Sequence, residues 1–152
     1  MIKVIENYVD YHFENEVLKL IPIKARRWDN RNQVIRYGNS IPYADNIISK
    51  DIPQVFTTIK DIQFDSVTIN EYLTNQHIPY HIDRPLSGET INVISLLSDA
   101  EINFKRGFEI QTYKLPRYSL TIFNGDLRWN WKHSLVAKEK RYSIVLRNSL
   151  NR

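Results

Sequence analysis

The chain has 152 residues, of which 42% are hydrophobic and 25% charged, and this size and composition are typical of one globular domain. It has no cysteine, which excludes disulfide bonds and thiolate metal sites, and no apolar run near the ~18 residues of a membrane span. The net charge of +4 is compatible with a nucleic-acid partner but is too small to identify one. Because residues 1–10 do not resemble a signal peptide, we expect a soluble protein of the cytoplasm or nucleus, with no membrane contact and no obligate protein partner.

Two segments in the N-terminal part have helical patterns. In residues 10–20, apolar side chains recur at helical spacing until Pro22 ends the pattern. Proline suits the first turn of a helix, and the apolar stripe that follows Pro53 predicts a second helix over residues 52–62. Residues 24–37, between these two segments, are polar and basic.

From residue 64 onward the pattern changes to short β runs separated by turn signals. Asn124-Gly125, between two of these runs, is a strong signal for a tight hairpin turn. Helices followed by strands predict a mainly β (α+β) fold, a double-sheet jelly roll with the N-terminal helices packed on one sheet. We expect a single domain in residues 1–152, with a β core in residues 64–148 and helical support in residues 1–63. The expected strands are residues 66–73, 78–82, 91–98, 101–105, 108–115, 118–124, 127–133 and 141–148.

Three polar residues of the β region can bind a metal ion. His81 and Asp83 are two positions apart, so on a strand both side chains point to the same face. His133 ends the expected strand 127–133, where it shares a face with two tryptophans and should point to the interior. Two imidazoles and one carboxylate can hold three positions on an iron ion and leave the others open for oxygen and a chelating co-substrate. Taken singly, a His-x-Asp pair can occur by chance, and an interior histidine is more often simply hydrogen-bonded within a core.

Two arginines and an Asn-x-Tyr pair are candidates for binding such a co-substrate. Arg141 and Arg147 share one face of the last expected strand, which should be covered because both its faces carry apolar residues. A covered arginine needs an anion, either a dicarboxylate ligand held by the guanidinium or an internal carboxylate. Alternatively, the ends of the strand lie in water and the arginines are not covered. Asn70 and Tyr72 share a face of the first expected strand, which could line a cavity or lie in water.

The order of these residues along the chain resembles the motif pattern of the AlkB family of iron(II)- and 2-oxoglutarate-dependent dioxygenases. The resemblance implies a double-stranded β-helix fold, with His81, Asp83 and His133 as the iron ligands of the catalytic centre. The residues that would contact 2-oxoglutarate are Asn70, Tyr72, Arg141 and Arg147, with Arg141 at the carboxylate farther from the metal. The matching segments are Asn70-Glu-Tyr72, His81-Ile-Asp83, residues 94–98, residues 115–120, residues 125–128, His133, Arg141-Tyr-Ser143 and Arg147.

The resemblance also implies the reaction. With Fe(II), 2-oxoglutarate and O2, AlkB-like enzymes remove N-methyl or other alkyl groups from nucleic-acid bases and release formaldehyde and succinate, so methylated DNA or RNA is the expected substrate. Residues 27–33 resemble the nucleotide-recognition lid of the family, in which Trp28 and His81 would sandwich a flipped-out base and Arg31 could meet a phosphate. Trp28 could instead be a core or rim residue of a basic loop. Two other functions stay open, the same chemistry on a protein or small molecule and non-catalytic binding of nucleic acid.

Two positions depart from the family pattern. Asn75 stands where the family has a glycine, and asparagine tolerates a positive φ better than most residues, so the turn can survive. Ser143 stands where the family has an asparagine between the two arginines, which should weaken one polar contact.

Overall fold

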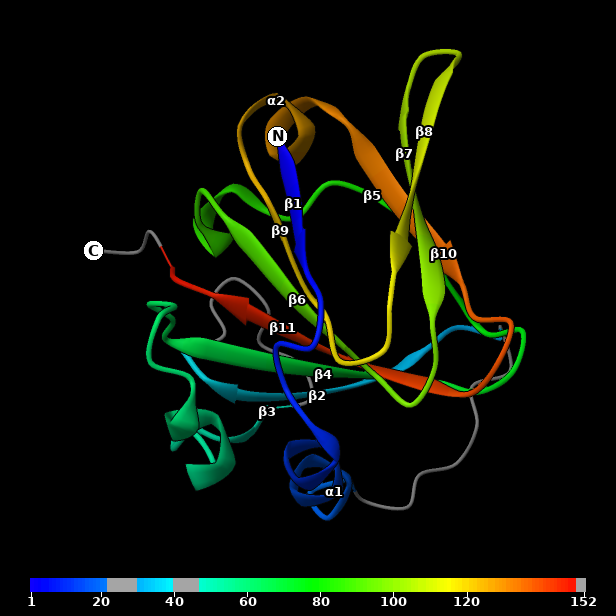
Figure 1. The fold of residues 1–152 in the computed structure, drawn as a ribbon. Coiled ribbons are helices and arrows are strands. Elements are labelled where there is room, and N and C mark those ends of the chain that lie inside the picture. Colours follow the sequence, from blue (N-terminus) through cyan, green and yellow to red (C-terminus); the bar gives the residue numbers. More distant parts are fainter. Residues whose placement is uncertain (22–29, 40–46, 150–152) are drawn as a thin grey trace.

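The computed structural model describes residues 1–21, 30–39 and 47–149, which form two β-sheets and a few short helices (Figure 1). Neighbouring strands are antiparallel, except that β2 and β3 are parallel. In spatial order the large sheet contains β1 (Ile2–Ile5), β9 (Leu120–Phe123), β6 (Ile91–Leu96), β11 (Arg141–Arg147), β4 (Ser66–Tyr72), β2 (Gln33–Gly38) and β3 (Ile47–Ser49). The small sheet contains β5 (His77–His81), β10 (Lys132–Val136), β7 (Ala100–Arg106) and β8 (Glu109–Leu115).

The helices of the described residues are few and short. They are the α-helices α1 (Tyr11–Leu18) and α2 (Gly125–Asn130) and the 3-10 helices η1 (Gln54–Thr58) and η2 (Pro85–Ser87). None of them has the length and hydropathy that a membrane-spanning helix needs. The mainly β fold expected from the sequence is therefore confirmed.

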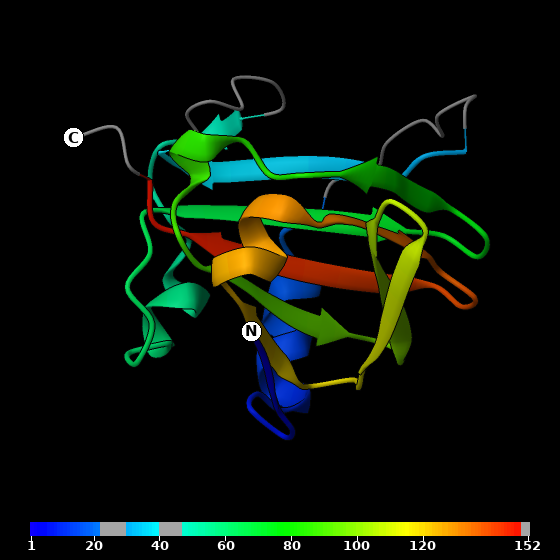
Figure 2. The ribbon, with the colours of Figure 1, turned by 90° about the horizontal axis from the view of Figure 1, so that it is seen from above.

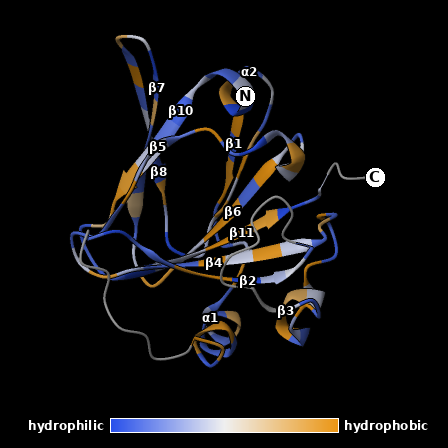
Figure 3. Ribbon diagram, turned by 180° about the vertical axis from the view of Figure 1, so that it is seen from behind, coloured by the Kyte–Doolittle hydropathy of each residue, from blue (hydrophilic) through white to orange (hydrophobic). Residues whose placement is uncertain are grey.

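Strand β11 shows how the large sheet divides its side chains. Every second residue from Arg141 to Arg147 faces the space between the two sheets, and the alternate residues Tyr142, Ile144 and Leu146 pack in a core on the other side. Strand β4 alternates in the same way, as the sequence predicts, and Figure 3 shows hydrophobic and hydrophilic residues alternating along these strands. The large sheet is thus buried on both faces, with the polar residues between the sheets.

Helix α1 covers the outer face of the large sheet. The side chain of Asp10 caps the helix by accepting a hydrogen bond of 2.9 Å from the backbone N–H of Phe13. Phe13 and Val17 are buried against the sheet, and Phe56 of η1 packs edge-on against Phe13. Figure 2 shows β2, β4 and β11 side by side with α1 on their far side. This arrangement confirms that a helix packs on one sheet.

The prediction of a second helix over residues 52–62 is wrong. The chain forms only the short 3-10 helix η1 there, and Pro53 at its N-cap provides no side-chain hydrogen bond. The hydroxyls of Thr57 and Thr58 donate to the carbonyl oxygens three residues earlier, at distances of 2.6 and 2.8 Å. Such bonds from threonine compete with the helical ladder, which helps to explain why no longer helix forms. Residues 1–63 also add strands β1, β2 and β3 to the large sheet, so this part is not only helical.

The predictions of a strand over residues 127–133 and of a hairpin turn before it are also wrong. Gly125, with a φ of +60°, begins helix α2, and the strand β10 starts only at Lys132. The carboxylate of Asp126 holds the helical turn by accepting hydrogen bonds from the side chains of Asn130 and Trp131. The alternation argument for His133 therefore fails, although β10 brings this residue to the interior by another route.

Candidate metal and co-substrate site

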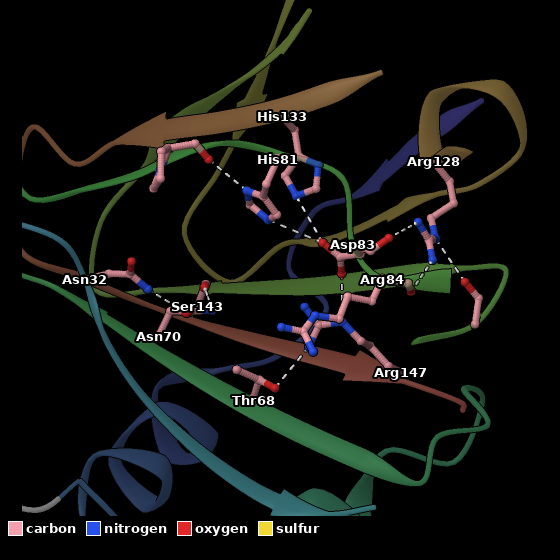
Figure 4. Close-up of polar contacts among 12 residues, drawn as sticks. Asn32, Thr68, Asn70, His81, Asp83, Arg84, Arg128, His133, Ser143 and Arg147 are labelled. Atoms are coloured by element: carbon pink, nitrogen blue, oxygen red, sulfur yellow. Dashed lines mark hydrogen bonds and ion pairs between the residues drawn. The ribbon is translucent and has the colours of Figure 1, made fainter. Parts of the chain in front are cut away.

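The two histidines and the aspartate of the predicted metal site lie together. His81 is the last residue of β5, Asp83 follows two residues later, and His133 of β10 is the cross-strand neighbour of His81. The Nε2 atoms of His81 and His133 lie 3.4 and 3.5 Å from Oδ1 of Asp83, and the centroids of the two rings are 4.2 Å apart. Figure 4 shows the three side chains pointing toward one another.

Hydrogen bonding orients the imidazole of His81, and burial keeps that of His133 neutral. Nδ1 of His81 lies 2.8 Å from the carbonyl oxygen of Pro79, which favours the hydrogen on Nδ1 and leaves the lone pair of Nε2 facing Asp83. Burial lowers the pKa of His133 to about 4, although the nearby Asp83 acts in the opposite direction. The neutral imidazole is the form that binds a metal ion.

Asp83 is buried but ionised. Burial by itself would raise the pKa of this carboxyl, but Arg147 and the two histidines outweigh burial and hold the pKa well below its usual value. Nε of Arg147 donates a hydrogen bond of 2.8 Å to Oδ2 of Asp83. Because Oδ2 is occupied in this way, Oδ1 is oriented toward the two histidines.

This donor set fits a ferrous ion. One ligand atom from each of the three residues lies within 4.8 Å of the others, so a single ion can contact all three. Two imidazoles and one carboxylate on one side of the ion are the usual arrangement in non-haem iron oxygenases. The rings of Phe104 and Phe123 pack against His133, with centroids 5.8 and 5.3 Å away, and help to keep water from this side.

Arg128 of α2 supports the loop that carries Asp83. Its guanidinium donates to three backbone carbonyl oxygens, from Nη1 to Asp83 at 2.8 Å, from Nη2 to Arg84 at 2.9 Å and from Nε to Gly88 at 2.9 Å. The side chain is buried and lies over the ring of Trp129. The sequence singles out Arg128 only as part of a matching motif, because its bonds reach 40 to 45 residues back along the chain.

Replacing Arg128 with glutamine should weaken metal binding about 10- to 100-fold, the range typical of groups that hold metal ligands in place. The physical reason is that the loop of Asp83 loses its anchors, while all three metal-binding side chains stay present. Titration with Co(II), followed by its visible absorption, measures the affinity without any turnover. Arg106→Gln is the control. Arg106 of β7 is half exposed and forms an ion pair with Asp126, which lies on the same helix α2 as Arg128. Equal Co(II) affinity in Arg128→Gln and wild type would contradict the assigned role.

Arg141 is a buried cation that has no anionic partner within residues 1–21, 30–39 and 47–149. Its side chain is 1% exposed, and its single hydrogen bond among the described residues is a long one of 3.4 Å from Nη2 to Oγ of Ser95. Its Nε and Nη1 atoms are buried with no hydrogen-bond partner in this part of the chain. Burial lowers the pKa of Arg141 to about 10, so the guanidinium still carries its charge at neutral pH. A buried charge in this state is costly unless a ligand provides the anion.

Arg147 has a different environment from Arg141. It bonds to Asp83, and its Nη1 donates a hydrogen bond of 3.0 Å to the hydroxyl of Thr68. Of the alternatives that the sequence left open for the strand arginines, an internal carboxylate thus applies to Arg147. Its contact with 2-oxoglutarate stays a prediction.

One cavity of about 310 Å³ joins the metal-binding residues to Arg141. Asn70 lines it, donates a hydrogen bond of 3.3 Å to the hydroxyl of Ser143 and accepts one of 2.7 Å from Asn32. Ser143 therefore keeps a polar contact at the position where the family has asparagine. Burial raises the pKa of Tyr72 to about 12, so this cavity residue keeps its hydroxyl hydrogen. Asn32 was missed from the sequence, although its alternation with Val34 and Arg36, which also line the cavity, was readable.

The residues expected to bind the substrate are only partly within the described structure. Arg31 lines the cavity beside Asn32, as a substrate contact would require. Trp28 and the rest of residues 22–29 lie outside the described residues. Asn75 has a φ of +68°, so this asparagine adopts the conformation expected where the family has glycine.

Sequence comparison relates the chain to parts of larger proteins. It is 28% identical over 158 aligned residues to the tRNA (carboxymethyluridine(34)-5-O)-methyltransferase alkbh8 of Xenopus tropicalis and 30% identical over 125 residues to ALKBH8 of Mus musculus. These alignments cover 90% and 70% of this chain but only 25% and 19% of those proteins. Uncharacterized protein L905 of Acanthamoeba polyphaga mimivirus is 27% identical over 158 residues, which cover 91% of this chain and 67% of L905. No protein-family model matches the chain.

Structural comparison agrees with these similarities. The solved structure of OsALKBH1 matches this fold with a TM-score of 0.70 over 97% of both chains, at 13% identity. OsALKBH1 is an AlkB-family dioxygenase, and ALKBH8 contains an AlkB domain. By homology to ALKBH8 and by its fold, this chain is a relative of the AlkB family of dioxygenases.

Proposed function

We propose that the chain is an Fe(II)- and 2-oxoglutarate-dependent dioxygenase with a double-stranded β-helix core, and that it removes N-methyl groups from nucleic-acid bases. The observation that carries this proposal is the guanidinium of Arg141, buried on the wall of the cavity that holds His81, Asp83 and His133, with two nitrogen atoms that have no hydrogen-bond partner among the described residues. A dicarboxylic co-substrate that reaches from the metal to Arg141 would supply the anion that this charge needs.

Each polar residue of the cavity has a role in this proposal. His81, Asp83 and His133 would hold the iron, which together with 2-oxoglutarate and O2 supplies the oxidising chemistry when bound. Arg141 would bind the carboxylate of 2-oxoglutarate farther from the metal, and Arg147 would keep Asp83 ionised and oriented. The hydroxyl of Tyr72 and the amide of Asn70 would donate hydrogen bonds to the same co-substrate.

The overall reaction balances without another reductant. One O2 and one 2-oxoglutarate are consumed, and one oxygen atom leaves in succinate while CO2 is released. The other oxygen atom is inserted into a C–H bond of the methyl group, and the hydroxymethyl product releases formaldehyde and the bare base. The chain's part is to position both substrates and to limit the access of water.

Charge in the cavity favours a nucleic-acid substrate over a neutral one. Besides Arg141 and Arg147, the described residues Arg31, Arg36 and Arg84 line the cavity, and Asp83 is the carboxylate among them. Guanidinium groups that line a cavity suit a ligand that brings phosphate as well as the carboxylates of 2-oxoglutarate. Trp28, which lies outside the described residues, would offer the aromatic face that receives the base.

Purified protein with Fe(II), ascorbate and 2-oxoglutarate should release formaldehyde from at least one member of a panel of DNA and RNA oligonucleotides, each carrying one N-methylated base. Mass spectrometry should show loss of the methyl group in the same oligonucleotide, and His81→Ala should give neither product because a metal ligand is lost. Succinate formation without formaldehyde from any oligonucleotide would support the same chemistry on a protein or small molecule. Tight oligonucleotide binding that is indifferent to iron, with no succinate, would support the non-catalytic alternative.

A further inference from the structure

The small sheet has an outer face that no described helix or strand covers (Figures 1 and 2). Three of the large hydrophobic side chains exposed on the molecule lie there: Tyr80 of β5, Ile110 of β8 and Val136 of β10. The hairpin of β7 and β8 extends beyond the rest of the sheet, and Phe108 at its tip is fully exposed. A single exposed hydrophobic side chain is ordinary, but several of them together on one uncovered face commonly mark a contact with another molecule.

One row of residues crosses this outer face. Ile110 of β8 is the neighbour of Lys105 of β7, and Lys105 is the neighbour of Lys132 of β10. Their chain neighbours Phe104 and His133 are in contact between the sheets, so the lysines point outward. The ammonium of Lys105 lies 5.5 Å from the centre of the Tyr80 ring at the end of the row. We call Tyr80, Lys105, Phe108, Ile110 and Lys132 the hairpin strip.

The two lysines of the strip form an uncompensated pair of like charges. Lysines directly opposite each other on neighbouring strands repel, and among the described residues neither has a carboxylate partner within ion-pair distance. Farther from the hairpin tip, Asp99 and Glu101 lie beside Lys114 and Lys138, and Glu101 forms an ion pair of 3.7 Å with Lys138, so the described charges balance there. Lys105 and Lys132 have no such carboxylates beside them among the described residues.

We propose that the hairpin strip binds single-stranded nucleic acid outside the cavity. Phosphates would compensate Lys105 and Lys132, and the rings of Phe108 and Tyr80 would offer faces for base stacking. The same charges disfavour a second copy of this chain as the occupant, because pairing two strips would bring more lysines together. This inference rests on the proposed function, since it extends the path of the substrate beyond the active site.

The strip leads toward the metal-binding residues. Strand β5 runs from Tyr80 directly into His81, and the next residue, Ile82, is partly exposed and lines the cavity. Arg84 lines the cavity two residues later. A strand held on the strip by its flanking nucleotides can thus present one base to the cavity, while the row of lysines holds the phosphates that do not enter.

Fluorescence anisotropy with labelled single-stranded DNA and RNA of one unmethylated sequence tests the strip without turnover. Lys105→Ala/Lys132→Ala should raise the Kd about tenfold and reduce the slope of log K against log salt by about 1.4, because two phosphate contacts are lost. Phe108→Ser should raise the Kd about fivefold or more with an unchanged salt slope, because stacking is lost and charge is not. All these side chains are exposed, so the unfolding temperature should stay the same.

Lys138→Ala is the matched control, since it removes one exposed lysine from the part of the same face where charges balance, and its Kd should equal that of wild type.

The outcomes separate this proposal from the proposed function. If wild type binds and demethylates an oligonucleotide while the strip variants bind it equally well, nucleic acid does not bind the strip and the proposed function stands. If wild type neither binds nor releases formaldehyde, both fail. A wild-type dimer that Phe108→Ser converts to a monomer in light scattering would identify a second copy as the occupant and overturn the proposal. Weaker binding of both DNA and RNA by the strip variants would support the proposal for either kind of strand. Weaker binding of only one of them would support it for that kind alone.

Discussion

Replacing Arg141 with methionine should raise the KM for 2-oxoglutarate about 10- to 150-fold, the equivalent of a charged hydrogen-bonded contact worth about 1.5–3 kcal/mol. The carboxylate of the co-substrate would lose the buried guanidinium of Arg141, which has no anion of its own among the described residues. Measuring succinate formation over a range of 2-oxoglutarate concentrations gives the change. Lys140→Met is the control, because Lys140 precedes Arg141 on the chain but is exposed.

The same substitution should make the protein more stable when no 2-oxoglutarate is present. Methionine fills a similar volume without a buried charge, so the free energy of unfolding should rise by about 1 kcal/mol or more. Adding 2-oxoglutarate should then raise the unfolding temperature of wild type but have little effect on Arg141→Met. If the variant is instead less stable than wild type by several degrees, Arg141 has a structural partner and the co-substrate site lies elsewhere.

Replacing Asp83 with alanine should abolish turnover and also destabilise the fold, by about 3–5 kcal/mol. The loss of turnover follows from the loss of a metal ligand, and the loss of stability follows because Arg147 is left buried without its carboxylate. Chemical denaturation measures the second effect. His81→Ala separates the two, since it removes a ligand that is one-third exposed and should abolish turnover with little change in stability.

The double variant Asp83→Ala/Arg147→Met tests this explanation. It removes both charges together, so it should recover most of the lost stability while remaining inactive. If the double variant is as unstable as Asp83→Ala alone, the ion pair is not what Asp83 contributes to the fold. Co(II) binding should stay weak in both variants, because neither restores the third ligand.

Most of the strands, and the meeting of His81, Asp83 and His133, could be predicted because their signals are local or ordered along the chain. Alternation of side chains placed Arg141 and Arg147 on one face of a covered strand, and the spacing of His81 and Asp83 placed them together. The position of the third ligand was harder. His133 reaches the same point because the pairing of β10 with β5 places it opposite His81, which no pattern near His133 reveals.

The errors arose where contacts distant in the chain decide the structure. Residues 127–133 alternate like a strand, but Asp126 closes a helical turn and Arg128 binds carbonyl groups some 40 residues earlier. The pairing of Arg147 with Asp83 spans 64 residues and was only one of the alternatives from the sequence. Strand β2 was missed because a polar and basic segment such as that around Arg36 is typical of a solvent-exposed loop. In the structure, the side chains of Asn32 and Arg36 instead line the cavity between the sheets.

Strand β11 lies at the centre of the large sheet, between β6 and β4, yet a ribosome delivers it after every other strand described here. Until it emerges, the two halves of the sheet have no common neighbour, and both Arg141 and the partner of Asp83 are absent. A nascent or prematurely terminated chain that lacks this strand therefore has neither the guanidinium of Arg141 nor the arginine that holds the carboxylate of Asp83. The polar wall of the cavity is complete only after translation has passed residue 147.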